Sequence, residues 1–492
     1  MVTLSPPSQF LAGCPKFRIL VLGNPESTKQ ELFSRIFGVD LEKKLVDDAF
    51  NGSQSIEQEL DLHGQNERLA IHTSPNFWAD DEHVYDQVCN FLVSRSTPST
   101  RLEDRVHCIW YCVASEVGRP VGQLERRFFN EALGSLASNV PAVLVFTKYN
   151  EFVSQVRLDW SHGAQSYGQS KVVVSHILRD LSSEKFEKQI GRKWADALGD
   201  SNGRIIPRVC VSDDDESSFL ALAETTLAGL RQRWVRLAFA AAQRNSASIS
   251  TQFCADTAAT EYFSVDTGHA RKLHGVDMGD ILPNFFAKAV QLFNMRDTAA
   301  TLVAPSLLGR VLDATFDASQ QKPLLAECLG PRSGVEVGEP RSQNTLLMSL
   351  SPHERAVLLA QAVAGIVLFL RRLASSQWAH KDYAVTLTEG AVVRALDEIW
   401  RMGRDKTSRL LETIEASTIF TMCPLKKAIA DLIARAVENA DGTSKPDHHR
   451  GAPRTIIVED ESDSHEISLS FVNDKGPEDV VLPCGLTILP LN

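Results

Sequence analysis

The sequence contains little that is typical of a secreted or a nucleic-acid-binding protein. Its nine cysteines are an odd number, scattered from Cys14 to Cys484 without a repeated close spacing, so a disulfide framework is not expected. Lys and Arg number 51 against 62 Asp and Glu, and the net charge of −11 repels nucleic acid and anionic membrane. The first residues lack a basic region followed by a sustained apolar stretch, so we expect no signal peptide. These features predict a soluble, intracellular, cytoplasmic protein in a reducing compartment.

Long apolar runs are also scarce. The longest extends from Ala356 to Arg372 and contains Gln361. A bilayer core requires about 20 apolar residues, so we expect a buried helix here and no transmembrane segment. The composition, 43% hydrophobic and 23% charged, is that of a folded globular protein. A chain of 492 residues is expected to form two or three domains.

Five short apolar runs alternate with helix-length segments in the first half of the chain. The runs end at Gly23, Thr73, Ala114, Thr147 and Ser212. Amphipathic stretches predict helices after the first run, over residues 80–95 and over residues 121–136. This alternation predicts an α/β fold with a doubly wound, mainly parallel sheet that helices cover on both faces.

Beyond residue 217 the strand pattern stops and the sequence indicates helices alone. We therefore expect a short flexible arm over residues 1–16, an α/β domain over 17–216 and an all-α helical domain over 217–440. We expect residues 441–492 to form a polar linker and an acidic tail with the strand-like runs "RTIIVED", "EISLSFV" and "VVLPCGLTILPL".

The loop after the first strand has the order of a phosphate-binding loop. Such a loop reads GxxxxGK[ST]: backbone N–H groups and the Lys hold phosphates, and the hydroxyl binds magnesium. Gly23 and Lys29 match, whereas Thr28 replaces the second glycine and Gln30 replaces the hydroxyl residue. Gln30 still offers a carbonyl oxygen to magnesium, but Glu26 places a carboxylate where phosphate would lie.

Later loops occupy the places of the other GTP-binding motifs. The DxxG motif, which serves the metal and the γ-phosphate, is replaced by Thr73-Ser74-Pro75-Asn76. The [NT]KxD motif, which binds guanine, is replaced by Thr147-Lys148-Tyr149-Asn150, with Asn in place of the guanine-binding Asp. Ser212 ends the last strand, at the place of the loop that backs the base.

On these segments the chain resembles the G-domain proteins abundant in mushroom-forming fungi, relatives of the translation-factor-type GTPases. The resemblance also includes "LAIHTSPNFWADD", "VHCIWYCVASEVGR", "ERRFFNEAL" and, further on, "AAQRNSAS" and "VQLFNMRDTA", and it covers roughly Phe17 to Asn439. It implies a P-loop NTPase (G domain) followed by a helical domain, with GTP as ligand and magnesium wherever nucleotide binds. The candidate nucleotide-binding residues are Gly23, Asn24, Pro25, Glu26, Ser27, Thr28, Lys29, Gln30, Thr73, Asn76, Thr147, Lys148, Asn150 and Ser212. No catalytic residue is assigned, and Gln30 is the only candidate metal ligand.

Three functions fit this pattern. The first is a pseudo-GTPase, a scaffold that binds guanine nucleotide weakly or not at all and acts through protein partners. The second is an active GTPase in which Ser27, Ser55 or Thr73 supplies missing ligands. The third is a nucleotide-free interaction module. Loss of the guanine contact and of the magnesium hydroxyl weakens nucleotide binding by roughly a thousandfold, so the joint changes favour the first.

Overall fold

A five-stranded parallel sheet is the centre of the first half of the chain. The computed structural model describes residues 9–23, 29–40, 55–74, 77, 81–163, 171–198, 205–262, 278–295, 301–303, 305–316, 352–378, 387–401, 414, 426–441, 456–458 and 467–469. The strands have the order β2-β1-β3-β4-β5, and every neighbouring pair is parallel. They are β1 (Phe17–Gly23), β2 (Leu69–Thr73), β3 (Cys108–Ala114), β4 (Ala142–Thr147) and β5 (Arg208–Cys210).

The predicted α/β fold with a parallel sheet is confirmed, and each predicted apolar run contains one strand. Every residue of β1 to β4 is buried. A strand covered on both faces has no polar side to expose, which is why these strands appear in the sequence as continuous apolar runs. The last run was expected to be longer, but β5 has only three residues and lies at the edge of the sheet.

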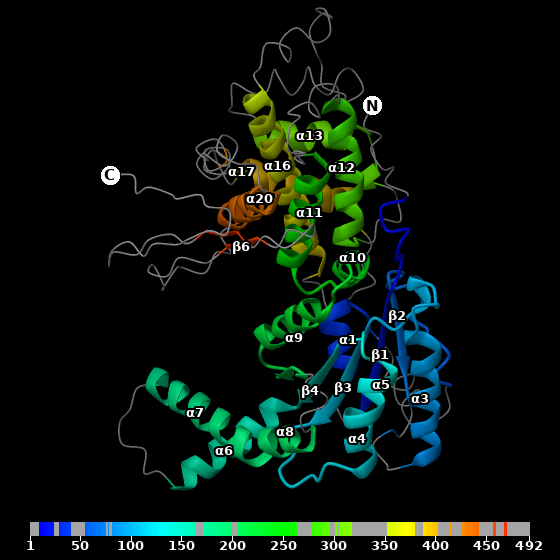
Figure 1. Cartoon of the computed structure of the whole chain (residues 1–492). Coiled ribbons are helices and arrows are strands. Elements are labelled where there is room, and N and C mark those ends of the chain that lie inside the picture. Colours follow the sequence, from blue (N-terminus) through cyan, green and yellow to red (C-terminus); the bar gives the residue numbers. More distant parts are fainter. Residues whose placement is uncertain are drawn as a thin grey trace, which may run out of the picture.

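Helices cover both faces of the sheet (Figure 1). Side chains of alternate strand residues point to opposite faces, so Trp110 packs with one set of helices and Tyr111 with the other. The first set is α1 (Lys29–Phe37), α9 (Glu216–Gly229) and α10 (Arg233–Ala242). The second is α3 (Glu82–Ser96) with α4 (Gln123–Arg127), the π-helical turn η3 (Phe128–Ala132) and α5 (Leu133–Leu136). A short 3₁₀ turn, η2 (Leu102–Asp104), precedes β3.

A helical segment that the sequence did not predict separates β4 from β5. It consists of α6 (Tyr149–Gly163), α7 (Lys171–Phe186), the π-helical turn η4 (Glu187–Gly191) and α8 (Arg192–Leu198). The pair α6 and α7 extends away from the sheet (Figure 1), and α8 returns to it. Trp194 of α8 is buried against Phe146 at 6.2 Å and Tyr111 at 6.0 Å between ring centroids.

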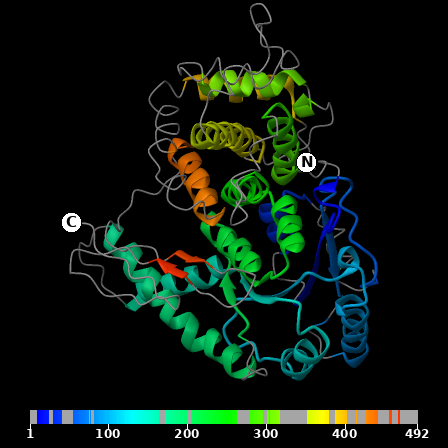
Figure 2. The same ribbon diagram turned by 45° about the horizontal axis from the view of Figure 1, so that its top comes forward.

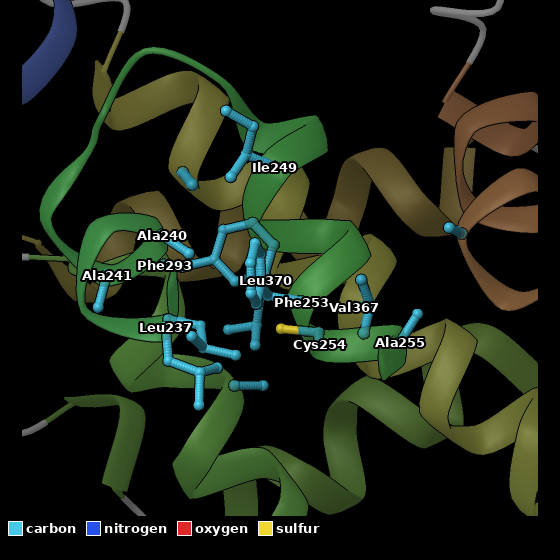
Figure 3. Packing of buried hydrophobic residues seen from close by; sticks show 14 of the residues in the cluster. Leu237, Ala240, Ala241, Ile249, Phe253, Cys254, Ala255, Phe293, Val367 and Leu370 are labelled. Atoms are coloured by element: carbon cyan, nitrogen blue, oxygen red, sulfur yellow. The ribbon is translucent and has the colours of Figure 1, made fainter. Parts of the chain in front are cut away.

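Helices form the rest of the described chain up to Asp441. They are α11 (Ala247–Tyr262), α12 (Met278–Phe293), the 3₁₀ turn η5 (Thr301–Val303), α13 (Pro305–Phe316), α16 (Pro352–Trp378), α17 (Glu389–Arg401) and α20 (Lys426–Asp441). Helix α16 packs against α11, α12, α13, α17 and α20. Figure 3 shows how Phe253, Phe293 and Leu370, from three of these helices, meet Leu237 of α10.

Helix α16 contains the apolar run that the sequence placed in a buried helix, and this prediction is confirmed. Residues Ala356–Trp378 form the one helix in the described chain that is long and apolar enough to cross a membrane, and 94% of its most apolar window is buried inside the protein. Packing against neighbouring helices therefore accounts for its composition.

The sheet and the helical half share one hydrophobic core. Phe239 of α10 meets Phe17 at 5.0 Å and Phe37 at 6.3 Å, both edge to face. Because Phe17 begins β1, the helical half lies at the amino ends of the strands, as Figures 1 and 2 show. The helix that follows the predicted boundary at residue 216, α9, packs on β4 and β5; the boundary itself stays a prediction.

The two ends of the chain differ from each other. Of the predicted flexible arm, residues 9–16 are described and pack into the core, because Phe10, Leu11 and Cys14 are buried there. In the predicted tail, β6 (Ile456–Val458) and β7 (Ile467–Leu469) form an antiparallel pair within the first two strand-like runs, and the third run lies outside the described residues.

Candidate functional site

The predicted site residues belong to one edge of the sheet, where the parallel strands end. Between β1 and β3 the strand order reverses, because the chain leaves β1 toward β2 on one side and leaves β3 toward β4 on the other. In open α/β sheets, ligands bind outside the carboxyl ends of the strands at such a switch point. Gly23, Thr73 and Thr147 each end a strand, and Ser212 follows β5 closely. Residues Asn24, Pro25, Glu26, Ser27, Thr28 and Asn76 lie outside the described part of the chain.

Gly23 has a conformation that only glycine adopts without strain. Its φ is +104°, and a Cβ added there would lie 2.0 Å from the carbonyl oxygen of Cys112 on β3. The backbone of β1 therefore closes directly onto β3 at the switch point. Helix α1 begins at Lys29, so its first N–H groups, which have no partner within the helix, belong to the same loop. The side chain of Gln30 is half-buried.

Aromatic packing holds the segment after β2. Thr73 and Ser74 are buried, and Phe77 is only 2% exposed. The ring of Phe77 lies 5.1 Å from that of Phe128 and 6.1 Å from that of Tyr111, between centroids. Phe77, which follows Asn76 in the sequence, is thus buried in the core on the α3 side of the sheet.

The corner between β4 and α6 has a strained backbone. Thr147 is buried, and its hydroxyl donates to the carbonyl of Val113 on β3 at 3.3 Å. Lys148 has a φ of +56°, which costs a residue with a Cβ about 1–3 kcal/mol and recurs at functional sites. The Lys148 carbonyl accepts from the N–H groups of Glu151 (3.1 Å) and Phe152 (3.3 Å), which begins α6.

Asn150 is the residue expected at the position of the guanine-binding Asp. Its Oδ1 atom is buried and has no hydrogen-bond partner in the structure. A buried acceptor without a donor costs about 1–3 kcal/mol, so this atom is suited to accept from a bound ligand.

The carboxyl edge is acidic. Burial raises the pKa of Asp213, which follows β5, and the charges of Glu31, Asp214 and Glu151 raise it further, while Arg35 lowers it. Arg35 is itself engaged by Glu31 at 3.0 Å and by Glu216 of α9. The carboxylates therefore come from α1, from α6 and from the loop after β5, and together they disfavour a polyphosphate.

Two other predicted hydroxyl residues have defined partners. Ser212 donates its N–H to Ser218 Oγ at 3.1 Å and accepts at its carbonyl from the N–H of Asp215 at 3.0 Å, so its backbone shapes the turn before α9. Ser55 is exposed, and its hydroxyl accepts from the N–H of Glu57 at 3.3 Å.

The acidic residues are the part of the site that the sequence analysis did not single out. The run Asp213-Asp214-Asp215 directly after the last strand is the signal that would have found them, because parallel strands deliver the loops that follow them to one edge. Glu31 and Glu151 join this run only through the fold.

Among the residues that the structure describes, no group of three or more His, Cys, Asp or Glu side chains could hold a metal ion. Magnesium at Gln30 thus stays a prediction that depends on bound nucleotide.

No protein-family model matches the sequence, and no curated protein matches it.

Proposed function

We propose that the α/β half is a degenerate G domain of the P-loop GTPase superfamily and that the protein is a pseudo-GTPase, a scaffold that binds guanine nucleotide weakly and does not hydrolyse it. The observation that carries this proposal is Gly23, which brings β1 against Cys112 at the switch point of the sheet and is followed by a loop that enters α1 at Lys29. This strand, loop and helix form the arrangement that a phosphate-binding loop requires.

The acidic edge supports weak binding. A triphosphate placed outside β1 meets the carboxylates of Glu31, Asp213 and Glu151, while Lys148 Nζ lies 3.9 Å from Glu151 and is partly neutralised by it. The sequence also lacks the hydroxyl that would bring magnesium to offset these charges. Affinity is therefore lowered by repulsion as well as by missing contacts.

The burial of Phe77, after β2, supports the absence of hydrolysis. Phosphoryl transfer to water needs a metal and a positioned nucleophile, and GTPase switch segments become ordered or released with the γ-phosphate. Here Phe77 is buried among Tyr85, Tyr111 and Phe128, so a switch-like movement of the chain at Phe77 requires removal of its aromatic ring from the core.

Asn150 favours a pocket that still binds a base, with altered contacts, over a fold that binds no nucleotide. Its buried, unpartnered Oδ1 gains a hydrogen bond if a ring N–H of a purine base lies against it. This contact increases affinity by about a factor of ten. That gain is far smaller than the affinity lost with the guanine-binding Asp and the magnesium hydroxyl.

The test is titration of the purified full chain with fluorescent GTP, with and without magnesium, beside Lys29→Ala and Asn150→Ala. We expect weak binding that magnesium changes little, that both substitutions weaken further, and that produces no phosphate. At a GTP concentration ten times the Kd, thermal stability rises by about 1.4 kcal/mol. Tight, magnesium-dependent binding with Lys29-dependent turnover would instead identify an active GTPase, and no response to GTP would leave a nucleotide-free interaction module.

A further inference from the structure

The outer edge of β2 is covered by the chain that precedes it. The Leu60 N–H donates to the carbonyl of Ile71 on this edge strand at 2.8 Å. Ile56 and Leu60 are buried. We call residues 55–60 the edge segment. A strand at the edge of a sheet presents backbone groups that pair with other chains unless something covers them, so the edge segment protects β2.

A buried histidine of β2 holds the edge segment. The His72 ring donates from Nδ1 to the carbonyl of Ile56 at 2.8 Å and accepts at Nε2 from the Arg18 guanidinium at 2.8 Å. A carbonyl oxygen and a guanidinium fix these roles, because the first only accepts and the second only donates. The ring is therefore neutral in this arrangement, with its proton on Nδ1.

Charged groups face the ring from three elements. They are Arg18 of β1, Arg95 of α3 and Glu59 of the edge segment. Arg18 Nη1 also donates to Glu59 Oε1 at 2.6 Å, and Lys16 Nζ lies 3.3 Å from the same carboxylate. Arg95 Nη2 lies 3.2 Å from Glu57 Oε2. The edge segment is thus joined to the sheet by one ring bond and by two carboxylates.

A proton on Nε2 is incompatible with these contacts. It would place an N–H group and a positive ring against the Arg18 guanidinium, which itself only donates. The Phe91 ring, 4.9 Å away between centroids, offers no hydrogen-bond acceptor in the plane of the imidazole. Removal of the edge segment takes Ile56 away from the ring and admits water, which accepts from both ring nitrogens. The protonated ring therefore favours a state in which the edge segment has left β2.

We propose that His72 is an acid-sensitive latch on the edge segment: the neutral ring holds the segment on β2, and the protonated ring releases it. Release uncovers the outer backbone edge of β2, including the carbonyl of Ile71. None of the latch side chains is a candidate nucleotide-binding residue, so the proposal holds whether or not a nucleotide binds.

The pH dependence of release differs from that of unfolding. Burial, partly offset by the bond to Ile56, and the charge of Arg18 lower the pKa of His72 from 6.5 to about 4 in the latched state. A ring that regains its ordinary pKa on release makes release about twentyfold more favourable at pH 5 than at pH 7. Unfolding of the whole chain also frees His107, whose pKa is lowered in the same way, and becomes about 400-fold more favourable.

The test is native-state hydrogen exchange of the full chain at pH 7 and pH 5, with rates corrected for the intrinsic effect of pH on exchange. Peptides covering residues 56–62 report on the edge segment, and peptides covering β3 report on unfolding, in urea sufficient for β3 to exchange. We expect the opening constant to rise about twentyfold in the edge segment and about 400-fold in β3. Glu59 remains ionised in this range, because its pKa is lowered from 4.5.

Two matched variants assign the effect to one ring. His72→Gln keeps a donor and an acceptor but does not titrate, so the edge segment should lose its pH dependence. His107→Gln is the control, because that ring bonds to the Arg18 N–H and to the carbonyl of Leu102. It should leave the twentyfold change in the edge segment and reduce the change in β3.

Three results would overturn the proposal. The first is an edge segment whose opening does not change between pH 7 and pH 5. The second is an edge segment that opens with the same constant and pH dependence as β3 in the unaltered chain, since these residues would then open only with the whole fold. The third is a pH dependence of the edge segment that persists in His72→Gln. If that variant does not fold, the first two comparisons, made on the unaltered chain, still decide.

Discussion

Lowering the pH from 7 to 5 is expected to destabilise the fold by about 2 kcal/mol at each of two buried histidines. His72 of β2 donates from Nδ1 to the carbonyl of Ile56 at 2.8 Å, and its Nε2 accepts from the Arg18 guanidinium at 2.8 Å. His107 has the opposite tautomer: its Nδ1 accepts from the N–H of Arg18 at 2.9 Å, and its Nε2 donates to the carbonyl of Leu102 at 2.8 Å. Both rings are held neutral, because each uses one nitrogen as an acceptor.

The magnitude follows from the pKa values. Burial, together with the nearby charge of Arg18, lowers the pKa of His72 and of His107 from 6.5 to about 4, although the bond from each ring to a backbone carbonyl partly offsets this. The unfolded chain therefore takes up a proton near pH 6.5 that the folded chain accepts only near pH 4. Stability is complete above pH 6.5, falls as the pH drops, and reaches its full loss below pH 4. The difference between the pKa of each ring in the unfolded chain and in the folded chain lowers the free energy of unfolding by about 2 kcal/mol per ring between pH 7 and pH 5. For both rings the loss is about 4 kcal/mol.

The assay is urea denaturation at pH 7, 6 and 5 of the unaltered chain, His72→Gln, His107→Gln and the double variant. Glutamine has both a donor and an acceptor but does not titrate, so each variant should lose about half of the pH dependence. His83→Gln, at an exposed site, is the control and should change nothing. Glu59 does not interfere, because its pKa is lowered from 4.5 and its titration lies below this pH range. An unchanged slope in the double variant would refute the reasoning.

Three further predictions concern the carboxyl edge. Gly23→Ala should destabilise the fold by about 2–5 kcal/mol in chemical denaturation, from the positive φ and the overlap with the Cys112 carbonyl, whereas Gly64→Ala, with positive φ but open space, should cost about 1 kcal/mol. Steady-state GTP hydrolysis should not exceed that of a Lys29→Ala control; turnover that depends on this lysine would contradict the missing-ligand argument. The amide of Asn150 both donates and accepts, which matches xanthine better than guanine, so competition binding should favour xanthosine triphosphate over GTP. Asn150→Asp should reverse that preference by about 1–3 kcal/mol per restored bond, and a preference of the unaltered chain for GTP would show that this residue does not contact the base.

The sheet was predictable from the sequence because burial on both faces leaves an unbroken apolar run in each strand. Residues 217–440 were expected to be helical as a whole, but α11 was not predicted as a separate helix within them. Its buried surface consists largely of Ala, Ser and Thr, as in "ASISTQFCADTAATEY", and carries no apolar periodicity. Helices α6 to α8 were missed for a different reason: they pack mainly on one another and on one aromatic cluster, so few of their positions are constrained to be apolar.

Within the candidate site, Gly23 was predictable because a strand, a glycine and a helix follow one another in the chain. The left-handed conformation of Lys148 and the unpartnered Oδ1 of Asn150 were not, since both depend on how α6 leaves the sheet. The acidic environment of Asp213 was not predictable for a similar reason, because the carboxylates around it come from α1, from α6 and from the loop after β5, which only the sheet brings together.

The shared core also bears on how this sequence can change over evolutionary time. Phe239 fills the space between Phe17 and Phe37, so neither half has a finished surface of its own, and the helical half cannot be exchanged for another module without re-forming the sheet's amino end. A substitution where these three rings meet must therefore be compensated by changes in both halves. The carboxyl edge, at the opposite end of the strands, lies away from this contact between the two halves. Apart from Gly23, whose backbone meets β3, residues in the loops there can change without a compensating change in the helical half.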